Sequence, residues 1–119
     1  MPKLSIRHAS RSGLLDAIAD RRDFDTHGAM RGESGLPLSG NGILPRDWRD
    51  VLNAQTRAAA VDFVVYSYAT PIGWHLKDGR WIVPDVSYSV TTSRHQGRLR
   101  WALHGADVID SVGLFVPGA

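Results

Sequence analysis

Residues 72–83 read Ile-Gly-Trp-His-Leu-Lys-Asp-Gly-Arg-Trp-Ile-Val, and this stretch carries the strongest local signal in the chain. Asp78-Gly79 between two alternating runs predicts a β-hairpin with a type I′ turn, since both central positions of that turn need positive φ. A two-residue loop pairs Leu76 with Trp81 across the hairpin. The large apolar side chains of the two strands then share one face: Trp74, Leu76, Trp81 and Val83.

Further strands are expected on both sides of this hairpin. Residues 62–68 are rich in Val, Phe and Tyr, and their large side chains on both faces predict a central strand. Pro71 cannot donate to a ladder, so the next strand is expected to begin after it, with Ile72 on the face of Trp74. Residues 86–90 alternate again and predict one more strand.

Two helices are expected in the N-terminal half of the chain. A stripe of apolar residues at helical spacing predicts one over residues 13–22. Pro45 suits the first position of a helix and predicts another over residues 45–60. Between them, residues 23–42 are rich in glycine and are interpreted as a loop, with a short hairpin near residues 24–31.

The last helix is expected over residues 92–104 and is basic in character. Ser93 and Gln96 fit a capping box, in which each side chain bonds the other residue's backbone N–H. Gly105 is a natural terminator. Gly97 inside the helix is unfavourable by about 1 kcal/mol relative to alanine, which predicts that another segment packs closely against it.

These elements predict an α+β fold, a small antiparallel sheet of three to five strands with the last helix on one face. The 119 residues fit one domain, whose motif-bearing core is residues 61–104. Residues 1–60 form a helical and loop region before it. The apolar tail, residues 106–119, is expected to add an edge strand, to cover the core or to seal a homodimer.

The composition excludes several classes of site. There is no cysteine, so disulfides and thiolate zinc sites are absent, and no apolar stretch approaches the roughly 20 residues that span a bilayer. Residues 1–10 lack the apolar segment of a signal peptide. We therefore expect a soluble intracellular protein that does not bind membranes. No cofactor loop and no metal-ligand spacing are recognisable, so neither a cofactor nor a metal is expected.

The basic residues are almost all arginines. Lys3 and Lys77 are the only lysines among 14 basic residues, and the formal net charge is +2. Arginine suits phosphate recognition, because its guanidinium group binds phosphate at two points. A GC-rich coding bias explains the same composition, and the two explanations remain open.

The start of the last helix is the candidate binding surface. Free backbone N–H groups and the positive end of the dipole favour anions there, and two arginines one turn apart add charge. The candidate residues are Thr92, Ser93, Arg94, His95, Gln96, Arg98 and Trp101. In a purely structural interpretation the polar residues only cap the helix, the histidine packs inside and the arginines are solvated.

An enzymatic interpretation is a metal-independent nuclease. His95 and Arg98, with His75 and Tyr88, are of the types that supply general acid–base catalysis and transition-state charge. No spacing in the sequence requires these four side chains to meet.

Two blocks carry a family resemblance. Residues 66–74, Tyr-Ser-Tyr-Ala-Thr-Pro-Ile-Gly-Trp, and residues 88–96, Tyr-Ser-Val-Thr-Thr-Ser-Arg-His-Gln, resemble a domain of unknown function in small proteins of actinobacterial phages, mycobacteriophages among them, and of related prophages. The likeness is strongest over residues 61–104 and weaker over residues 24–32. The family form usually has alanine at Gly73.

The resemblance implies a phage-encoded protein made in the host cytoplasm, and it implies no reaction. We therefore expect a non-enzymatic phage accessory protein that binds a host macromolecule through the helix over residues 92–104. The partner is either nucleic acid or a host regulatory or defence protein. A metal-independent nuclease and a structural, self-associating module are two further hypotheses.

Overall fold

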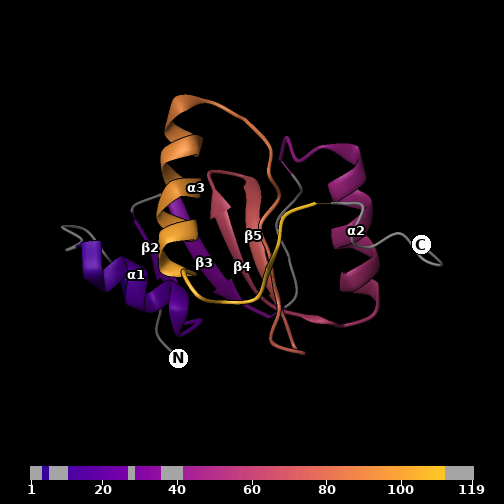
Figure 1. Ribbon diagram of the computed structural model, residues 1–119, viewed down its shortest axis with the longest axis horizontal. Coiled ribbons are helices and arrows are strands. Elements are labelled where there is room, and N and C mark those ends of the chain that lie inside the picture. Colours follow the sequence, from indigo (N-terminus) through magenta and orange to yellow (C-terminus); the bar gives the residue numbers. More distant parts are fainter. Residues whose placement is uncertain (1–3, 6–10, 27–28, 36–41, 112–119) are drawn as a thin grey trace.

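Residues 4–5, 11–26, 29–35 and 42–111 are described by a computed structural model. Three helices and seven strands lie in this part of the chain, and helices cover both faces of a single sheet (Figure 1). The elements are β1 (Leu4–Ser5), α1 (Arg11–Ala19), β2 (Phe24–Asp25), β3 (Met30–Ser34), α2 (Arg46–Arg57), β4 (Val61–Ser67), β5 (Thr70–Leu76), β6 (Trp81–Ile82), α3 (Val90–Ala102) and β7 (Val108–Ile109). The α+β class is confirmed, but the sheet has seven strands rather than the three to five expected.

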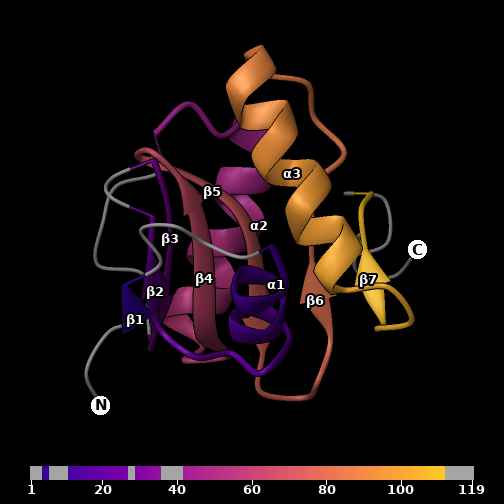
Figure 2. The same cartoon turned by 90° about the vertical axis from the view of Figure 1, so that its left-hand side faces the viewer.

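The order of the strands in the sheet follows the order of the chain, from β1 to β7. The pairs β1–β2 and β6–β7 are parallel, and the other pairs are antiparallel. A helix connects the strands of each parallel pair: α1 lies between β1 and β2, and α3 lies between β6 and β7. Both crossover connections therefore run in the same direction along the sheet. Because such crossovers are almost always right-handed, their helices α1 and α3 must cover the same face. Figure 2 shows α1 and α3 on the near face of the sheet and α2 behind it.

Two apolar clusters lie on the two faces of the sheet. The cluster under α1 and α3 includes Ile18, Phe63, Val65 and Leu99. The cluster under α2 includes Trp48, Leu52, Val64 and Trp74. Successive residues of β4 thus enter opposite clusters, as expected for a strand that lies between two others with both faces covered. The prediction that β4 is a central strand is confirmed.

The loop between β5 and β6 has three residues rather than two. Leu76 N donates a 2.8 Å hydrogen bond to Arg80 O, so residues 77–79 form the loop. Within it only Gly79, at φ 99°, has positive φ. This is a three-residue hairpin loop that ends on a left-handed glycine, and the predicted type I′ turn is wrong.

The extra loop residue shifts the register of the hairpin by one position. Trp74 pairs with Ile82, and His75 pairs with Trp81. Trp74 therefore lies in the cluster under α2, whereas Trp81 and Val83 lie in the cluster under α1 and α3. The prediction of one shared face is wrong, because a shift of one residue moves a side chain to the opposite face.

Strand β5 begins before Pro71, contrary to the prediction. Pro71 lies opposite Tyr66, where the pairing of β4 and β5 is irregular. β6 pairs with β5 only near its other end, so no neighbouring strand requires the missing N–H. The same irregularity places Ile72 in the cluster under α1 and α3, whereas Trp74 lies in the cluster under α2. The prediction that Ile72 and Trp74 share a face is therefore wrong.

Residues 83–89 form an arch between β6 and α3, and the strand predicted over residues 86–90 is absent from the described structure (Figure 1). Side chains of α3 hold the arch through its carbonyl groups. Gln96 Nε2 donates to Val86 O at 2.8 Å, and Arg100 Nη2 donates to Pro84 O at 3.3 Å. These bonds occupy backbone groups of the kind that a strand would use.

The cap of α3 lies four residues before the predicted one. The helix begins at Val90, and Ser89 Oγ accepts a 3.2 Å hydrogen bond from Thr92 N. Ser93 is therefore inside the helix, and the predicted capping box of Ser93 and Gln96 is wrong. Both serines precede helical residues, and the sequence pattern alone does not distinguish their caps.

The hairpin and the edge strand predicted outside the central region are both present. The hairpin expected near residues 24–31 is the antiparallel pair β2–β3, and the edge strand expected in the tail is β7, which pairs with β6. α1 lies close to its predicted range. Pro45 occupies the N-cap of α2 rather than its first helical position. Residues 112–119 of the tail lie outside the described residues.

Two glycines near α3 have opposite surroundings. A Cβ at Gly73 would lie 2.5 Å from Leu99 Cδ2 and 3.3 Å from Ile82 O, so the helix packs directly on the backbone of β5 there. A Cβ at Gly97 would meet nothing within 4 Å. The expected close packing against Gly97 is wrong, and it is found at Gly73.

We expect alanine to act in opposite directions at these positions. Gly97→Ala should raise the free energy of unfolding by up to about 1 kcal/mol, because the helix gains propensity without a clash. Gly73→Ala should lower it by about 1–3 kcal/mol through overpacking. Denaturant unfolding measures both effects. The loss at Gly73 should shrink in a Leu99→Ala background, and equal loss with and without Leu99 would contradict the proposed clash.

Candidate functional site

Three of the predicted binding residues lie on one exposed strip of α3: Arg94, Arg98 and Trp101. They are spaced by four and three residues, and a helix of about 3.6 residues per turn brings such positions onto one side. We call these three residues the α3 strip. The buried residues of the helix face the sheet instead: Thr92, His95, Gln96 and Leu99.

The two guanidinium groups of the α3 strip have no partner among the residues that the structure describes. Within the described residues, neither Arg94 nor Arg98 forms an ion pair or a side-chain hydrogen bond. By contrast, Arg80 and Arg100 each lie beside an aspartate. A guanidinium group without an internal acid can bind a phosphate or carboxylate of another molecule.

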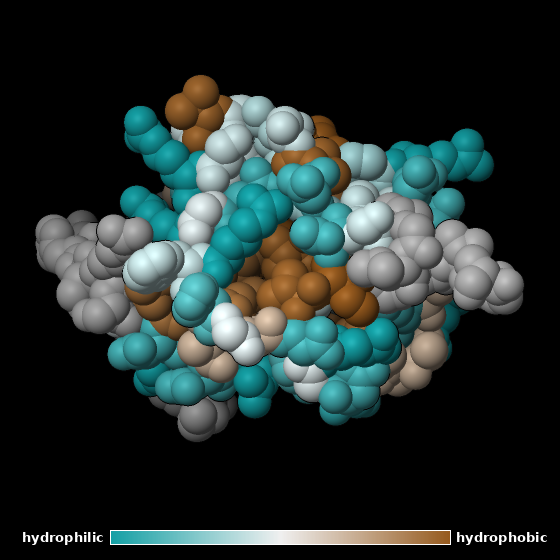
Figure 3. All heavy atoms as spheres, viewed as in Figure 1, coloured by the Kyte–Doolittle hydropathy of each residue, from teal (hydrophilic) through white to brown (hydrophobic). Residues whose placement is uncertain are grey.

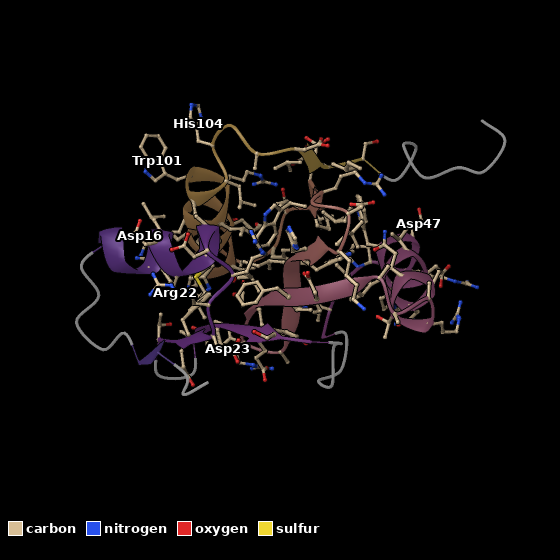
Figure 4. The ribbon with its side chains drawn as sticks, turned by 90° about the horizontal axis from the view of Figure 1, so that it is seen from below. Asp16, Arg22, Asp23, Asp47, Trp101 and His104 are labelled. Carbon is tan, nitrogen blue, oxygen red and sulfur yellow. The ribbon has the colours of Figure 1, made fainter. Side chains whose placement is uncertain are left out.

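Trp101 presents an aromatic ring at the end of the strip. Its side chain is 60% exposed, and its ring stacks on that of His104, with centroids 6.2 Å apart and planes inclined by 29°. Figure 4 shows both rings extending outward from the C-terminal end of α3. The other three tryptophans are buried, so Trp101 is the one indole that a partner can reach.

His95 lies in the core rather than at an anion-binding helix start. Its side chain is 4% exposed, and its Nδ1 lies 2.6 Å from Ser67 Oγ. Ser67 also donates to Thr92 Oγ1 at 3.1 Å, which links two turns of α3 to the end of β4. Burial lowers the pKa of His95, and the nearby charge of Arg98 lowers it further. His95 is therefore a structural contact here.

The remaining predicted binding residues are either buried or exposed on another side of α3. Thr92 and Gln96 are buried and bonded within the protein, to Ser89 and Val86 respectively. Ser93 is exposed but lies about 100° around the helix from Arg94. Only the three residues of the α3 strip are both exposed and aligned.

The four residues predicted for a nuclease do not converge. His75 lies opposite Phe63, and its Nδ1 is 2.6 Å from Asp62 Oδ1. His95 contacts Ser67, four residues further along β4, which is about 13 Å at the rise of a strand. Two buried histidines at this separation cannot act as acid and base on one phosphate.

Tyr88, the fourth residue predicted for a nuclease, lies in the arch and packs against the cluster under α1 and α3. Among the described residues, its hydroxyl is the one buried side-chain polar atom without a hydrogen-bond partner. Desolvation raises the pKa of this hydroxyl. A protonated hydroxyl enclosed by apolar groups is poorly placed to exchange protons with a substrate.

Tyr68 is an exposed aromatic residue that the predicted site did not include. It follows β4 in the two-residue loop Tyr68-Ala69, where its φ of 53° is left-handed. Its side chain is 52% exposed, and its ring centroid lies 5.9 Å from that of His95. Neither loop residue is a glycine or asparagine, so the sequence carries no turn signal that would have placed this ring beside α3.

The described surface also contains a recess. Figure 3 shows hydrophobic side chains at the floor of a hollow near the middle of the face that Figure 1 presents, with mainly hydrophilic side chains around it. In the part of the chain that the structure covers, no three His, Cys, Asp or Glu residues are close enough to hold a metal ion. The helices in that part are all too short or too polar to cross a membrane.

Comparison with known proteins gives a family without an assigned activity. The match is to "Family of unknown function (DUF8033)", and it covers residues 18–107. No curated protein and no solved structure matches the chain. The matched region contains the sheet from β2 to β6 together with α2 and α3.

The buried His95 predicts that stability falls in mild acid. Because the folded protein lowers the pKa of His95, the unfolded chain binds the proton more readily, and stability is lost as the pH falls below about 6.5. Urea unfolding between about pH 7.5 and pH 5.5 should show a steeper loss for the wild type than for His95→Asn. His104→Asn, at an exposed site, should keep the wild-type profile. Parallel profiles for wild type and His95→Asn would contradict this role.

The unsatisfied hydroxyl of Tyr88 predicts that Tyr88→Phe is neutral or stabilising. Removing a buried polar group that has no partner removes its desolvation penalty, and a gain of about 1 kcal/mol is expected. Thermal unfolding measures the change. Tyr88→Leu is the matched control and should be destabilising, because it removes ring packing as well. A clear loss of stability in Tyr88→Phe would show that the hydroxyl has a partner.

Proposed function

The chain belongs to a family of unknown function, DUF8033, and we propose that it is a non-enzymatic phage accessory protein that binds nucleic acid in the host cytoplasm through the α3 strip. The phage assignment is supported by the two sequence blocks that resemble actinobacteriophage proteins. The binding assignment is supported by the surface of α3.

One observation carries the proposal: two guanidinium groups that form no ion pair or side-chain hydrogen bond with the described residues lie one helical turn apart, beside an exposed indole ring. Arginine binds phosphate at two points, and an exposed aromatic ring can stack on a base. The strip therefore offers both kinds of contact that nucleic acids use. The small net charge of +2 implies local contact rather than long-range attraction.

A host regulatory or defence protein is the second candidate partner. Arginine and tryptophan are enriched where protein interfaces are strongest, and Trp101 is 60% exposed. Such an interface would depend on the indole more than on salt. The two partner classes therefore differ in how strongly binding depends on salt, which a binding assay measures.

A nuclease and a self-associating module have less support from the described residues. The nuclease requires His95, which is buried and bonded to Ser67. The self-associating module requires residues 106–119 to be available to a second copy, but Val108 and Ile109 pair with β6 of their own chain.

The proposal predicts salt-dependent binding that requires the two arginines. Two phosphate contacts give a slope of about −1.4 to −1.8 in a plot of log K against log salt, depending on the strand form. Arg94→Ala with Arg98→Ala should remove most of that slope and weaken binding. Fluorescence anisotropy with labelled DNA and RNA at several salt concentrations measures both quantities.

The matched control removes two arginines from the other face of the sheet. Arg46 and Arg49 are exposed on α2, and their joint replacement by alanine changes the net charge by the same amount. This variant should bind as the wild type does. Equal losses in both double variants would indicate a general charge effect, and no binding in any variant would reject a nucleic-acid partner.

A further inference from the structure

Tyr68 forms a second aromatic platform near the N-terminal half of α3. Its backbone is fixed on both sides, because Tyr68 N donates to Ala29 O at 2.7 Å and Arg31 Nη1 donates to Tyr68 O at 2.9 Å. A tyrosine in the left-handed region is strained, and these bonds maintain it. The backbone that carries the ring is therefore held in place, and the residue remains half exposed.

The ring of Tyr68 belongs to the same side of the molecule as the α3 strip. It contacts the ring of His95, and the charge of Arg98 is close enough to lower the pKa of that histidine. Viewed along the helix axis, Arg94, Arg98 and Trp101 lie within about 60° of one another, on the His95 side of the buried face. Tyr68 and Trp101 thus mark two ends of one surface, with Arg98 between their levels and Arg94 close to the level of Tyr68.

The spacing of the two platforms suits a short run of nucleotides. Tyr68 lies at the level of His95, six residues before Trp101, which is about 9 Å along the helix axis. A stacked strand advances about 3.4 Å per nucleotide, so roughly three nucleotides cover this distance. Arg98 lies where an intervening phosphate would pass, and Arg94 lies at the Tyr68 end of the surface.

We propose that this surface binds single-stranded nucleic acid, with bases stacked on Tyr68 and Trp101 and phosphates held by Arg94 and Arg98. This inference rests on the proposed function and specifies its substrate class. A protruding ring can stack only on a base whose face is open, and in a duplex those faces are covered by neighbouring bases. Two exposed rings and two cations on one surface therefore favour a single strand over a duplex.

The test compares single-stranded and duplex probes with variants of Tyr68. The probe is a fluorescein-labelled oligothymidine of about 10 nucleotides, within the usual site size of single-strand binders, and its duplex with oligoadenine. Wild type should bind the single strand at least about tenfold more tightly. Tyr68→Asn removes the ring but tolerates the left-handed backbone, and it should weaken single-strand binding by about tenfold or more. Tyr68→Trp should retain binding.

Intrinsic fluorescence provides an independent readout. Trp101 is the exposed tryptophan, so quenching on addition of the single strand reports a base at Trp101. Circular dichroism and the thermal midpoint check that each Tyr68 variant is folded.

The outcomes separate this inference from the proposed function. Binding that depends on Arg94 and Arg98 but is unchanged in Tyr68→Asn, or is as tight for the duplex, overturns the single-strand inference and leaves the proposed function standing. Absence of binding to both probes overturns both. Single-strand preference lost in Tyr68→Asn and kept in Tyr68→Trp supports the inference.

Discussion

The position of α3 on the sheet is held by the packing of Leu99 on Gly73 and by a buried hydrogen bond between Ser67 Oγ and His95 Nδ1. Apolar packing alone lets a helix slide or turn by small amounts, whereas a buried polar pair must stay together because separation leaves both groups unsatisfied. The bond joins the end of a central strand to the second turn of the helix. Together with the buried Leu99, the bond keeps this face of α3 on the sheet, and it joins the helix to the residue that precedes the Tyr68-Ala69 loop.

The secondary structure was largely predictable from the sequence, but the pairing of the hairpin was not. Strong β formers and helical stripes identify β4, β5 and all three helices. The face of Trp81 depended on whether the loop before it has two residues or three, and Asp78-Gly79 is compatible with both. Likewise Ser89 and Ser93 are both acceptable caps, and the arch bonded to Gln96 decided between them. Tertiary contacts therefore determine the register of the hairpin and the N-cap of α3.

The candidate site was predictable in part for a similar reason. The sequence identified the correct helix and its arginines, but it grouped residues by closeness in the chain. Burial divides that group, because neighbouring positions on a helix point about 100° apart. His95 entered the core, whereas Arg94 stayed exposed. Tyr68 was not among the predicted site residues, because it reaches the helix only through the folded sheet.

The agreement between strand order and chain order has a consequence for folding kinetics. The β2–β3, β4–β5 and β5–β6 pairings join strands that are close in the chain, so each of them closes a short loop at a small entropic cost. The β1–β2, β3–β4 and β6–β7 pairings close longer loops, each of which contains a helix. The β4–β5 hairpin, with its two-residue connection, can form first and act as a template for β3 on one side and β6 on the other. Local pairing of this kind favours rapid formation of the β4–β5–β6 unit, whereas β3 can join it only after the loop that contains α2 has closed. Until then the edge of β4 that pairs with β3 remains open to aggregation.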